Sequence, residues 1–203
     1  MKLYHSATSP YVRKVMVLLH ETGQIDDVEL VESSGTPMSP ADPLVGKNPL
    51  TKVPALERPD APTLFDSRVI CAYLDDRAGS GLYSASPRRW DILTLEALAD
   101  GILDAALLIV YESRLRPPEH QSTSWTEAQW AKVARACDAL EGRWIGHLTG
   151  PLDMGQIAVA CALGYLDLRH DARGWRTGRP QLAEWFAAFE SRESMQATRP
   201  PAA

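Results

Sequence analysis

Residues 48–56 read Asn-Pro-Leu-Thr-Lys-Val-Pro-Ala-Leu, and a proline at position 54 interrupts an otherwise apolar strand. A proline inside a strand is typical of an edge strand, a bulge or a cis peptide bond. A plain edge strand is the simplest interpretation. A cis bond would instead leave the amide and carbonyl of Val53 facing outwards, where a peptide-like ligand could pair with them as an added strand does.

Short segments of alternating type surround this stretch and predict a small mixed α/β domain over residues 1–78. Residues 10–22 carry apolar side chains at the i, i+3, i+4 and i+7 spacing of an amphipathic helix, and a second helix is expected to begin near Ser67. Four segments are typical of strands, namely residues 2–5, 28–32, 53–57 and 63–65.

The second half of the chain is predicted to be an all-helical bundle over residues 88–203. Residues 79–87 lie in a run rich in Gly, Ser and Pro and are expected to form a linker. Strand patterns disappear after it. Helical periodicity covers residues 87–116, 126–148, 154–169 and 180–192. The run of arginines around Trp175 is expected to be a solvated connection between the last two helices.

Composition excludes several classes of function. The 203 residues include 21 Lys and Arg against 26 Asp and Glu, which leaves no positive excess for a nucleic acid or an anionic membrane. No apolar run suits a signal peptide or a bilayer span. The three cysteines and five histidines lack the spacing of a disulfide framework or a metal site, so we expect no metal and a cytoplasmic protein.

Two helix starts in the first domain could also bind a ligand. Ser9 precedes Pro10, which is a favourable start because Ser caps free amides and Pro suits the first helical position. The same hydroxyl, at the positive end of a helix, could hydrogen-bond an anion such as a thiolate. Asp66 and Ser67 are likewise a possible cap or a site for a ligand carboxylate.

Three stretches taken together resemble the cytosolic glutathione transferase superfamily, most closely its small bacterial, serine-type members. They are residues 9–15 (SPYVRKV), 48–56 (NPLTKVPAL) and 64–70 (LFDSRVI). The resemblance covers nearly the whole chain. It implies a thioredoxin-like first domain that binds glutathione, an all-helical domain that lines the pocket for an electrophile, a role in detoxification, and a homodimer.

The resemblance also implies a role for individual residues. The hydroxyl of Ser9 would stabilise the glutathione thiolate, and Val53, before a cis Pro54, would pair its backbone with the cysteinyl unit. Asp66 and Ser67 would hold the γ-glutamyl end. Lys52 is a weaker candidate for the glycyl carboxylate. Candidates for the electrophile pocket are Tyr11 and Tyr111.

Thiolate stabilisation makes chemical sense because a free thiol titrates near about 8.5 and only its thiolate is nucleophilic. The expected function is the conjugation of glutathione to a small apolar electrophile. Two alternatives stay open. One is a non-catalytic glutathione- or ligand-binding or regulatory protein on the same scaffold. The other is a glutathione-dependent disulfide reductase, a chemistry that usually requires Cys where Ser9 stands.

The sequence departs from the family pattern at two places. Serine-type members often place a basic residue after the serine, and here Arg13 and Lys14 are both candidates. The central helix of the second domain usually opens with a Ser/Thr-x-x-Asp capping box. This chain has Asp153 followed by Gln156, which we interpret as a structural cap.

Overall fold

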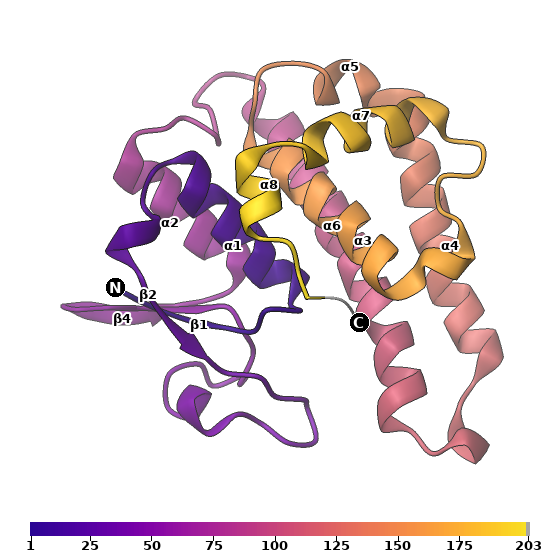
Figure 1. Ribbon diagram of the computed structural model, residues 1–203, viewed down its shortest axis with the longest axis horizontal. Coiled ribbons are helices and arrows are strands. Elements are labelled where there is room, and N and C mark those ends of the chain that lie inside the picture. The colour runs from indigo at the N-terminus through magenta and orange to yellow at the C-terminus, as the bar shows by residue number, and fades with distance from the viewer. Residues whose placement is uncertain (202–203) are drawn as a thin grey trace. The chain divides into compact units, whose positions relative to one another are not determined.

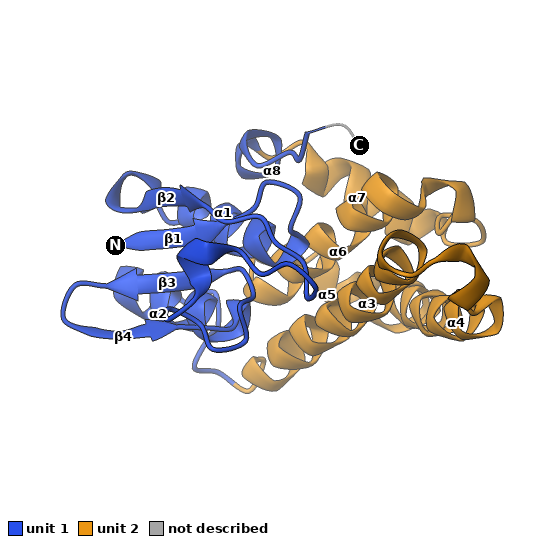
Figure 2. Cartoon of the chain, turned by 90° about the horizontal axis from the view of Figure 1, so that it is seen from below, with its two compact units in different colours: residues 1–86, 193–201 blue, residues 87–192, 202–203 orange. Residues whose placement is uncertain are grey.

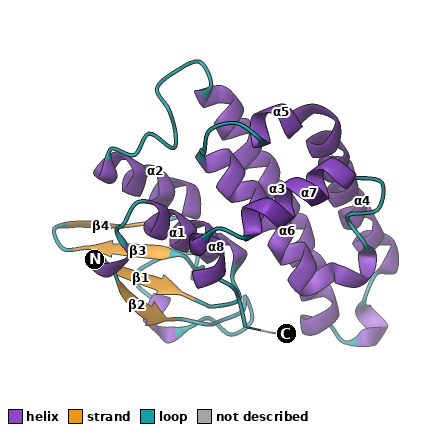
Figure 3. Cartoon of the chain, turned by 45° about the horizontal axis from the view of Figure 1, so that its top comes forward, coloured by secondary structure: helices purple, strands orange, loops and turns teal. Residues whose placement is uncertain are grey.

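The computed structural model describes residues 1–201, which divide into two compact units (Figure 2). Residues 1–86 and 193–201 form the first unit, and residues 87–192 form the second. Figure 3 shows that all strands lie in the first unit and that the second is helical. This confirms the predicted fold class. No helix within residues 1–201 combines the length and apolar character needed to cross a membrane.

The first unit contains a four-stranded mixed sheet with strand order β2-β1-β3-β4. Strand β1 is parallel to β2 and antiparallel to β3, which is antiparallel to β4. The third strand begins after Pro54 rather than at Val53. The strands are β1 (Lys2–His5), β2 (Glu29–Glu32), β3 (Ala55–Arg58) and β4 (Ala61–Leu64).

Helices α1 (Pro10–Glu21) and α2 (Ser67–Ala78) cover one face of this sheet (Figure 1). The short 3-10 helix η1 (Ile25–Asp27) connects α1 to β2. On the opposite face, Leu44 of the 3-10 helix η2 (Asp42–Leu44) packs with Tyr4 and Ala55. Tyr4 and Ala55 are paired across β1 and β3. Neighbouring strand residues point to opposite faces, so Leu3 and Leu56 fill the helix-covered side.

The second unit is built around α6, whose residues from Met154 to Leu166 are all buried. A helix that is apolar on every side belongs in a core. Helix α6 packs directly on α3, because a Cβ at Gly155 would lie 2.9 Å from the Cβ of Leu95. The helices are α3 (Arg89–Leu115), α4 (Thr123–Ala139), α5 (Ile145–Leu148), α6 (Met154–His170) and α7 (Pro180–Glu190), with short 3-10 helices η3 (Pro118–His120) and η5 (Asp171–Arg173).

The single helix expected at residues 126–148 is divided in the structure. A π-helical turn, η4 (Leu140–Trp144), separates α4 from α5. This turn brings Glu141 to the start of α7, where its carboxylate accepts hydrogen bonds from the amides of Gln181 and Leu182. Helix α7 has no capping side chain of its own, so Glu141 satisfies amides that would otherwise lack partners.

The C-terminal segment also differs from the expectation, which placed residues 88–203 in the helical domain. Helix α8 (Glu193–Ala197) belongs to the first unit, where it packs on α1. The guanidinium of Arg13 donates to the carbonyl of Met195 (3.1 Å), and the Ser194 hydroxyl donates to Glu21 (2.5 Å). Residues 202–203 lie outside the described part of the chain.

Candidate glutathione site

Strand register brings the three sequence stretches to one end of the sheet. Ser9 follows the carboxyl end of β1, while Val53 and Pro54 precede the amino end of β3, and Tyr4 pairs with Ala55. Asp66 follows the carboxyl end of β4, and Leu64 pairs with Leu56. Because both neighbours of β3 run antiparallel to it, these three chain segments lie at the same end of the sheet, where β1 and β4 finish and β3 begins.

Ser9 is the N-cap of α1, and its Oγ accepts a hydrogen bond from the amide of Val12 (3.3 Å). Its carbonyl accepts from the amide of Arg13 (3.0 Å), as expected at a helix start. The side chain is half-buried. The hydroxyl therefore lies at the positive end of α1 and retains a proton that it can donate to an anion.

The two basic residues after Ser9 are both buried. Arg13 holds the carbonyl of Met195, and its Nε has no hydrogen-bond partner within residues 1–201. Lys14 is completely buried, and its positive charge helps to lower the pKa of Asp66. Of the two, Lys14 is thus the residue that supplies positive charge to the predicted site, whereas Arg13 fastens α8 to α1.

The Val53–Pro54 peptide bond is cis, the isomer that the sequence could not decide. No hydrogen bond within residues 1–201 uses the main-chain amide or carbonyl of Val53, so both groups have unused hydrogen-bonding capacity. The Lys52 side chain is exposed.

Asn48 organises the loop that carries these residues, a role that sequence reasoning missed. Its side chain is 2% exposed; Nδ2 donates to the carbonyl of Lys52 (2.8 Å), and Oδ1 accepts from the amide of Leu50 (2.9 Å). The signal available in the sequence was an Asn-Pro pair before a strand, which is typical of a side-chain-stabilised turn.

Asp66 caps α2 and forms an ion pair with Arg68. Its Oδ1 accepts from the Arg68 amide (3.0 Å), and Oδ2 accepts from the guanidinium (2.9 Å). Burial would raise the pKa of Asp66, but the hydrogen bonds and charge of Arg68, with the charge of Lys14, hold it below its usual value. Ser67 opens α2 and is 2% exposed. The peptide bond between Phe65 and Asp66 is also cis.

The two tyrosines named for the electrophile belong to different units. Tyr11 lies on α1 and is half-buried. Tyr111 lies on α3 of the second unit and is also half-buried, and burial raises the pKa of its hydroxyl. The structure therefore places Ser9, Val53 and Asp66 at one end of the sheet in the first unit. Tyr111 belongs to α3 of the second unit.

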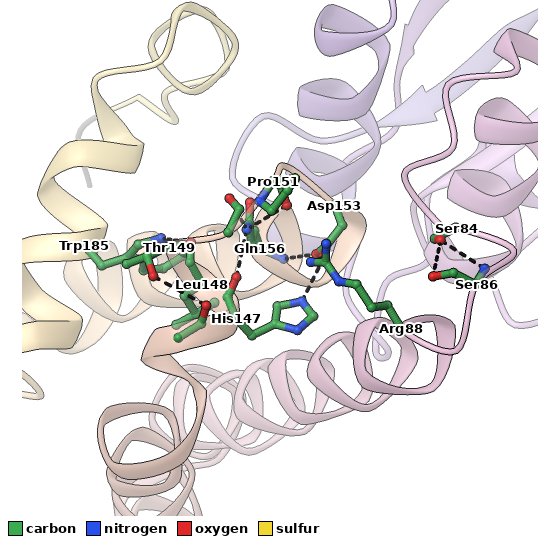
Figure 4. Close-up of polar contacts among 12 residues, drawn as sticks. Ser84, Ser86, Arg88, His147, Leu148, Thr149, Pro151, Asp153, Gln156 and Trp185 are labelled. Carbon is green, nitrogen blue, oxygen red and sulfur yellow. Dashed lines mark hydrogen bonds and ion pairs between the residues drawn. The ribbon is translucent and has the colours of Figure 1, made fainter.

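A polar network at the start of α6 supports the structural interpretation of Asp153 (Figure 4). Its Oδ1 accepts from the amide of Gln156 (3.2 Å), while Oδ2 contacts Nε2 of His147 (2.8 Å) and the guanidinium of Arg88 (3.1 Å). The side-chain amide of Gln156 donates to the carbonyls of His147, Gly150 and Pro151. The network fastens the α5–α6 connection to the residue that precedes α3.

Comparison with known proteins agrees with this geometry. Residues 8–77 match the glutathione S-transferase N-terminal domain, and residues 123–188 match its C-terminal domain. The Escherichia coli K12 protein "Uncharacterized GST-like protein YibF" is 38% identical over the full length of both chains. Glutathione S-transferase F6 of Arabidopsis thaliana is 27% identical, with 97% of each chain covered.

Solved structures of glutathione transferase family members are similar to this chain over its whole length. A glutathione transferase family member from Pseudomonas fluorescens Pf-5 with bound glutathione is 49% identical, with a TM-score of 0.96 and 99% of each chain covered. A second structure from that organism, with bound S-(propanoic acid)-glutathione, is 48% identical, with a TM-score of 0.92 and full coverage of both chains. By these matches over its whole length, the chain belongs to the glutathione transferase superfamily.

Proposed function

We propose that the protein binds glutathione at the end of the sheet where Ser9, Val53 and Asp66 lie. We further propose that it transfers the glutathione sulfur to an electrophile. The observation that carries this proposal is the meeting of three segments with complementary chemistry. The open backbone of Val53 suits a peptide, while the N-termini of α1 and α2 suit anions.

Each residue has a defined part in this proposal. Val53 pairs its amide and carbonyl with the cysteinyl unit, and Lys52 contributes a positive charge towards the glycyl carboxylate. Asp66, held ionised by Arg68 and Lys14, accepts hydrogen bonds from the α-ammonium of the γ-glutamyl end. The Ser67 hydroxyl and the first amides of α2 bind the carboxylate beside it.

Ser9 stabilises the thiolate. Its hydroxyl donates to the sulfur while its oxygen still accepts from the amide of Val12, and the N-terminus of α1 adds its positive end. A fall of two units in the thiol pKa requires about 2.7 kcal/mol, which a charge-assisted hydrogen bond and a helix terminus together can supply. The thiolate then attacks the electrophile directly, so the conjugation needs no protein acid or base.

The two Pseudomonas fluorescens structures support conjugation rather than binding alone. One contains glutathione and the other contains S-(propanoic acid)-glutathione, a molecule in which the sulfur already carries a further group. The disulfide reductase alternative has less support. The only three cysteines of the chain are buried, and burial raises the pKa of Cys137 to about 11, which suppresses its thiolate.

We also propose Tyr111, on α3 of the helical unit, as a residue that contacts the electrophile. Tyr11, on α1 of the first unit, is proposed separately as another. Family membership supports a homodimer and a role in detoxification, and three cysteines that form no disulfide within residues 1–201 fit the reducing cytoplasm. Light scattering on the purified protein measures the oligomeric state directly. A mass of about 22 kDa in place of twice that value would contradict the dimer.

Thermal unfolding with millimolar reduced glutathione tests the binding proposal. A ligand at a hundredfold excess over its dissociation constant stabilises the folded state by about 2.7 kcal/mol. The unmodified protein should show a clear rise in Tm, and Ser67→Ala a much smaller one. No rise in Tm for the unmodified protein would contradict the binding proposal.

Initial rates with a chlorinated nitroaromatic then distinguish a transferase from a binding protein, because sulfur attack at the ring carbon releases chloride.

A further inference from the structure

A polar network in the first unit joins the sheet to the loop that precedes β3. The hydroxyl of Tyr4 on β1 donates to Oε2 of Glu57 on β3 (2.7 Å). The same carboxylate oxygen lies 2.7 Å from Nζ of Lys47, which stands between η2 and Val53 in the chain. One carboxylate therefore ties two strands of the sheet to a residue of the loop.

Strand register explains why these groups meet. Tyr4 pairs with Ala55, and Glu57 is two residues further along β3, so the three side chains point to the sheet face opposite the helices. On this face Leu44 of η2 packs against Tyr4 and Ala55. Residues 41–53, here called the η2 loop, are thus attached to the sheet by apolar packing as well as by the polar network.

The network is ionised at neutral pH. Hydrogen bonds from Lys47 and Tyr4 hold the pKa of Glu57 below its ordinary value, and the carboxylate raises the pKa of both of its partners. The side chains of Lys47 and Glu57 are 39% and 31% exposed, so their ion pair adds little to the stability of the whole unit. Its consequence lies in where it holds the η2 loop.

A short path leads from Lys47 to the backbone of Val53. Lys47 is followed by Asn48, whose side-chain amide donates to the carbonyl of Lys52 (2.8 Å). The peptide bond between Lys52 and Val53 is trans, so its carbonyl and its amide point in opposite directions. The Val53 side chain also packs against the apolar cluster that contains Tyr4. The direction of the Val53 amide therefore depends on how the η2 loop is held on the sheet.

We propose that Glu57 and Tyr4 are positioning residues for glutathione, because through Lys47 they hold the η2 loop where the Val53 amide meets the cysteinyl unit. Their own side chains do not contact the ligand in this arrangement. The inference rests on the proposed glutathione site and adds the residues that align it. Since the network acts on the backbone of Val53 and not on the sulfur, its loss should raise the KM for glutathione and leave kcat unchanged.

Calorimetry with reduced glutathione tests the network in Glu57→Gln, which keeps the shape of the side chain and removes its charge. We expect the affinity to fall about two- to fivefold, the range that corresponds to a partly exposed ion pair. Lys47→Met should give the same loss, and the double variant should lose no more than either single variant, because both changes break one link. A fall in kcat at saturating glutathione in Glu57→Gln would contradict the proposal.

Glu29→Gln is the matched control. Glu29 on β2 forms an ion pair with Lys2 on β1 (3.3 Å), so the same substitution removes an ion pair from the same sheet. Lys2 is the first residue of β1, whereas Ser9 follows the last, so this pair lies at the end of the sheet away from the proposed site. The affinity for glutathione should be unchanged in this variant.

A second ligand distinguishes positioning from a direct contact between Lys47 and the glycyl carboxylate. γ-Glutamylcysteine lacks the glycyl unit and keeps the cysteinyl unit that Val53 is proposed to bind. Glu57→Gln and Lys47→Met should therefore weaken the binding of γ-glutamylcysteine and of glutathione by the same factor. A loss confined to glutathione, or an unchanged affinity in both variants, would overturn this proposal alone. Failure of the unmodified protein to bind glutathione would overturn the proposed function as well.

Discussion

Asn48 is the residue on which the geometry of the peptide-binding loop depends most. Both functions of its amide side chain are used, towards Lys52 and Leu50, and the side chain is buried. We predict that Asn48→Ala lowers the free energy of unfolding by about 1–3 kcal/mol, because buried polar groups lose their partners. It should also weaken glutathione binding, because Val53 is no longer held in place.

Urea unfolding and calorimetry check this prediction for Asn48→Ala. Leu50→Ala is the control, since the Leu50 side chain is 63% exposed and its amide, which binds Asn48, is retained. If both variants bind glutathione with the affinity of the unmodified protein, Asn48 does not position the loop.

His170 gives the protein a pH dependence of stability. Burial lowers the pKa of His170 below its ordinary value of 6.5, because the charged imidazolium is poorly solvated there. The unfolded chain takes up the proton first as the pH falls. Stability is therefore complete above about pH 7 and declines below 6.5, with a slope of at most about 1.4 kcal/mol per pH unit from this group.

We predict a flatter dependence between pH 7.5 and 5 for His170→Gln, which keeps a donor for the Ala106 carbonyl. His120→Gln, at an exposed position, should retain the slope of the unmodified protein. Chemical unfolding at a series of pH values measures all three. Identical slopes in the three proteins would remove His170 as the source.

At the scale of elements, Asp153 links the start of α6 to Arg88 and His147 (Figure 4). Its side chain is 5% exposed, so Asp153→Ala leaves several buried groups without a partner and should cost about 3 kcal/mol of unfolding free energy. Asp153→Asn should cost less, because Asn still caps the helix. Urea unfolding gives both values; equal losses would show that only the charge matters.

Sequence patterns predicted most elements and failed where a distant partner decides the structure. Periodicity identified α1, α3 and α6. The loop around Trp175 was expected to be solvated, yet Trp175 is 2% exposed, and the arginines beside it pair with Glu127, Asp167 and Asp138. Those acids lie on other segments, so local sequence could not reveal the pairs. The π-helical turn likewise exists where Glu141 meets α7.

At the scale of the whole molecule, the chain enters the helical unit after Ser86 and returns to the first unit after Arg192. The sequence indicated two consecutive domains because composition changes near residues 79–87, whereas nothing local marks the return of α8. The candidate site was largely predictable, since Ser9, Val53 and Asp66 stand in recognisable stretches. The bonds of Asn48 and the burial of Lys14 depend on packing, so they required the structure.

The central claim is that Ser9 stabilises the thiolate of bound glutathione, and ultraviolet thiolate absorbance against pH tests it most directly. In the unmodified protein, bound glutathione should titrate well below the value of free glutathione. In Ser9→Ala, the affinity should be nearly unchanged while the pKa of the bound thiol rises by at least one unit, which corresponds to about 1.4 kcal/mol and roughly tenfold less thiolate near neutral pH. Bound glutathione that titrates at the same pH with and without the Ser9 hydroxyl would contradict the claim.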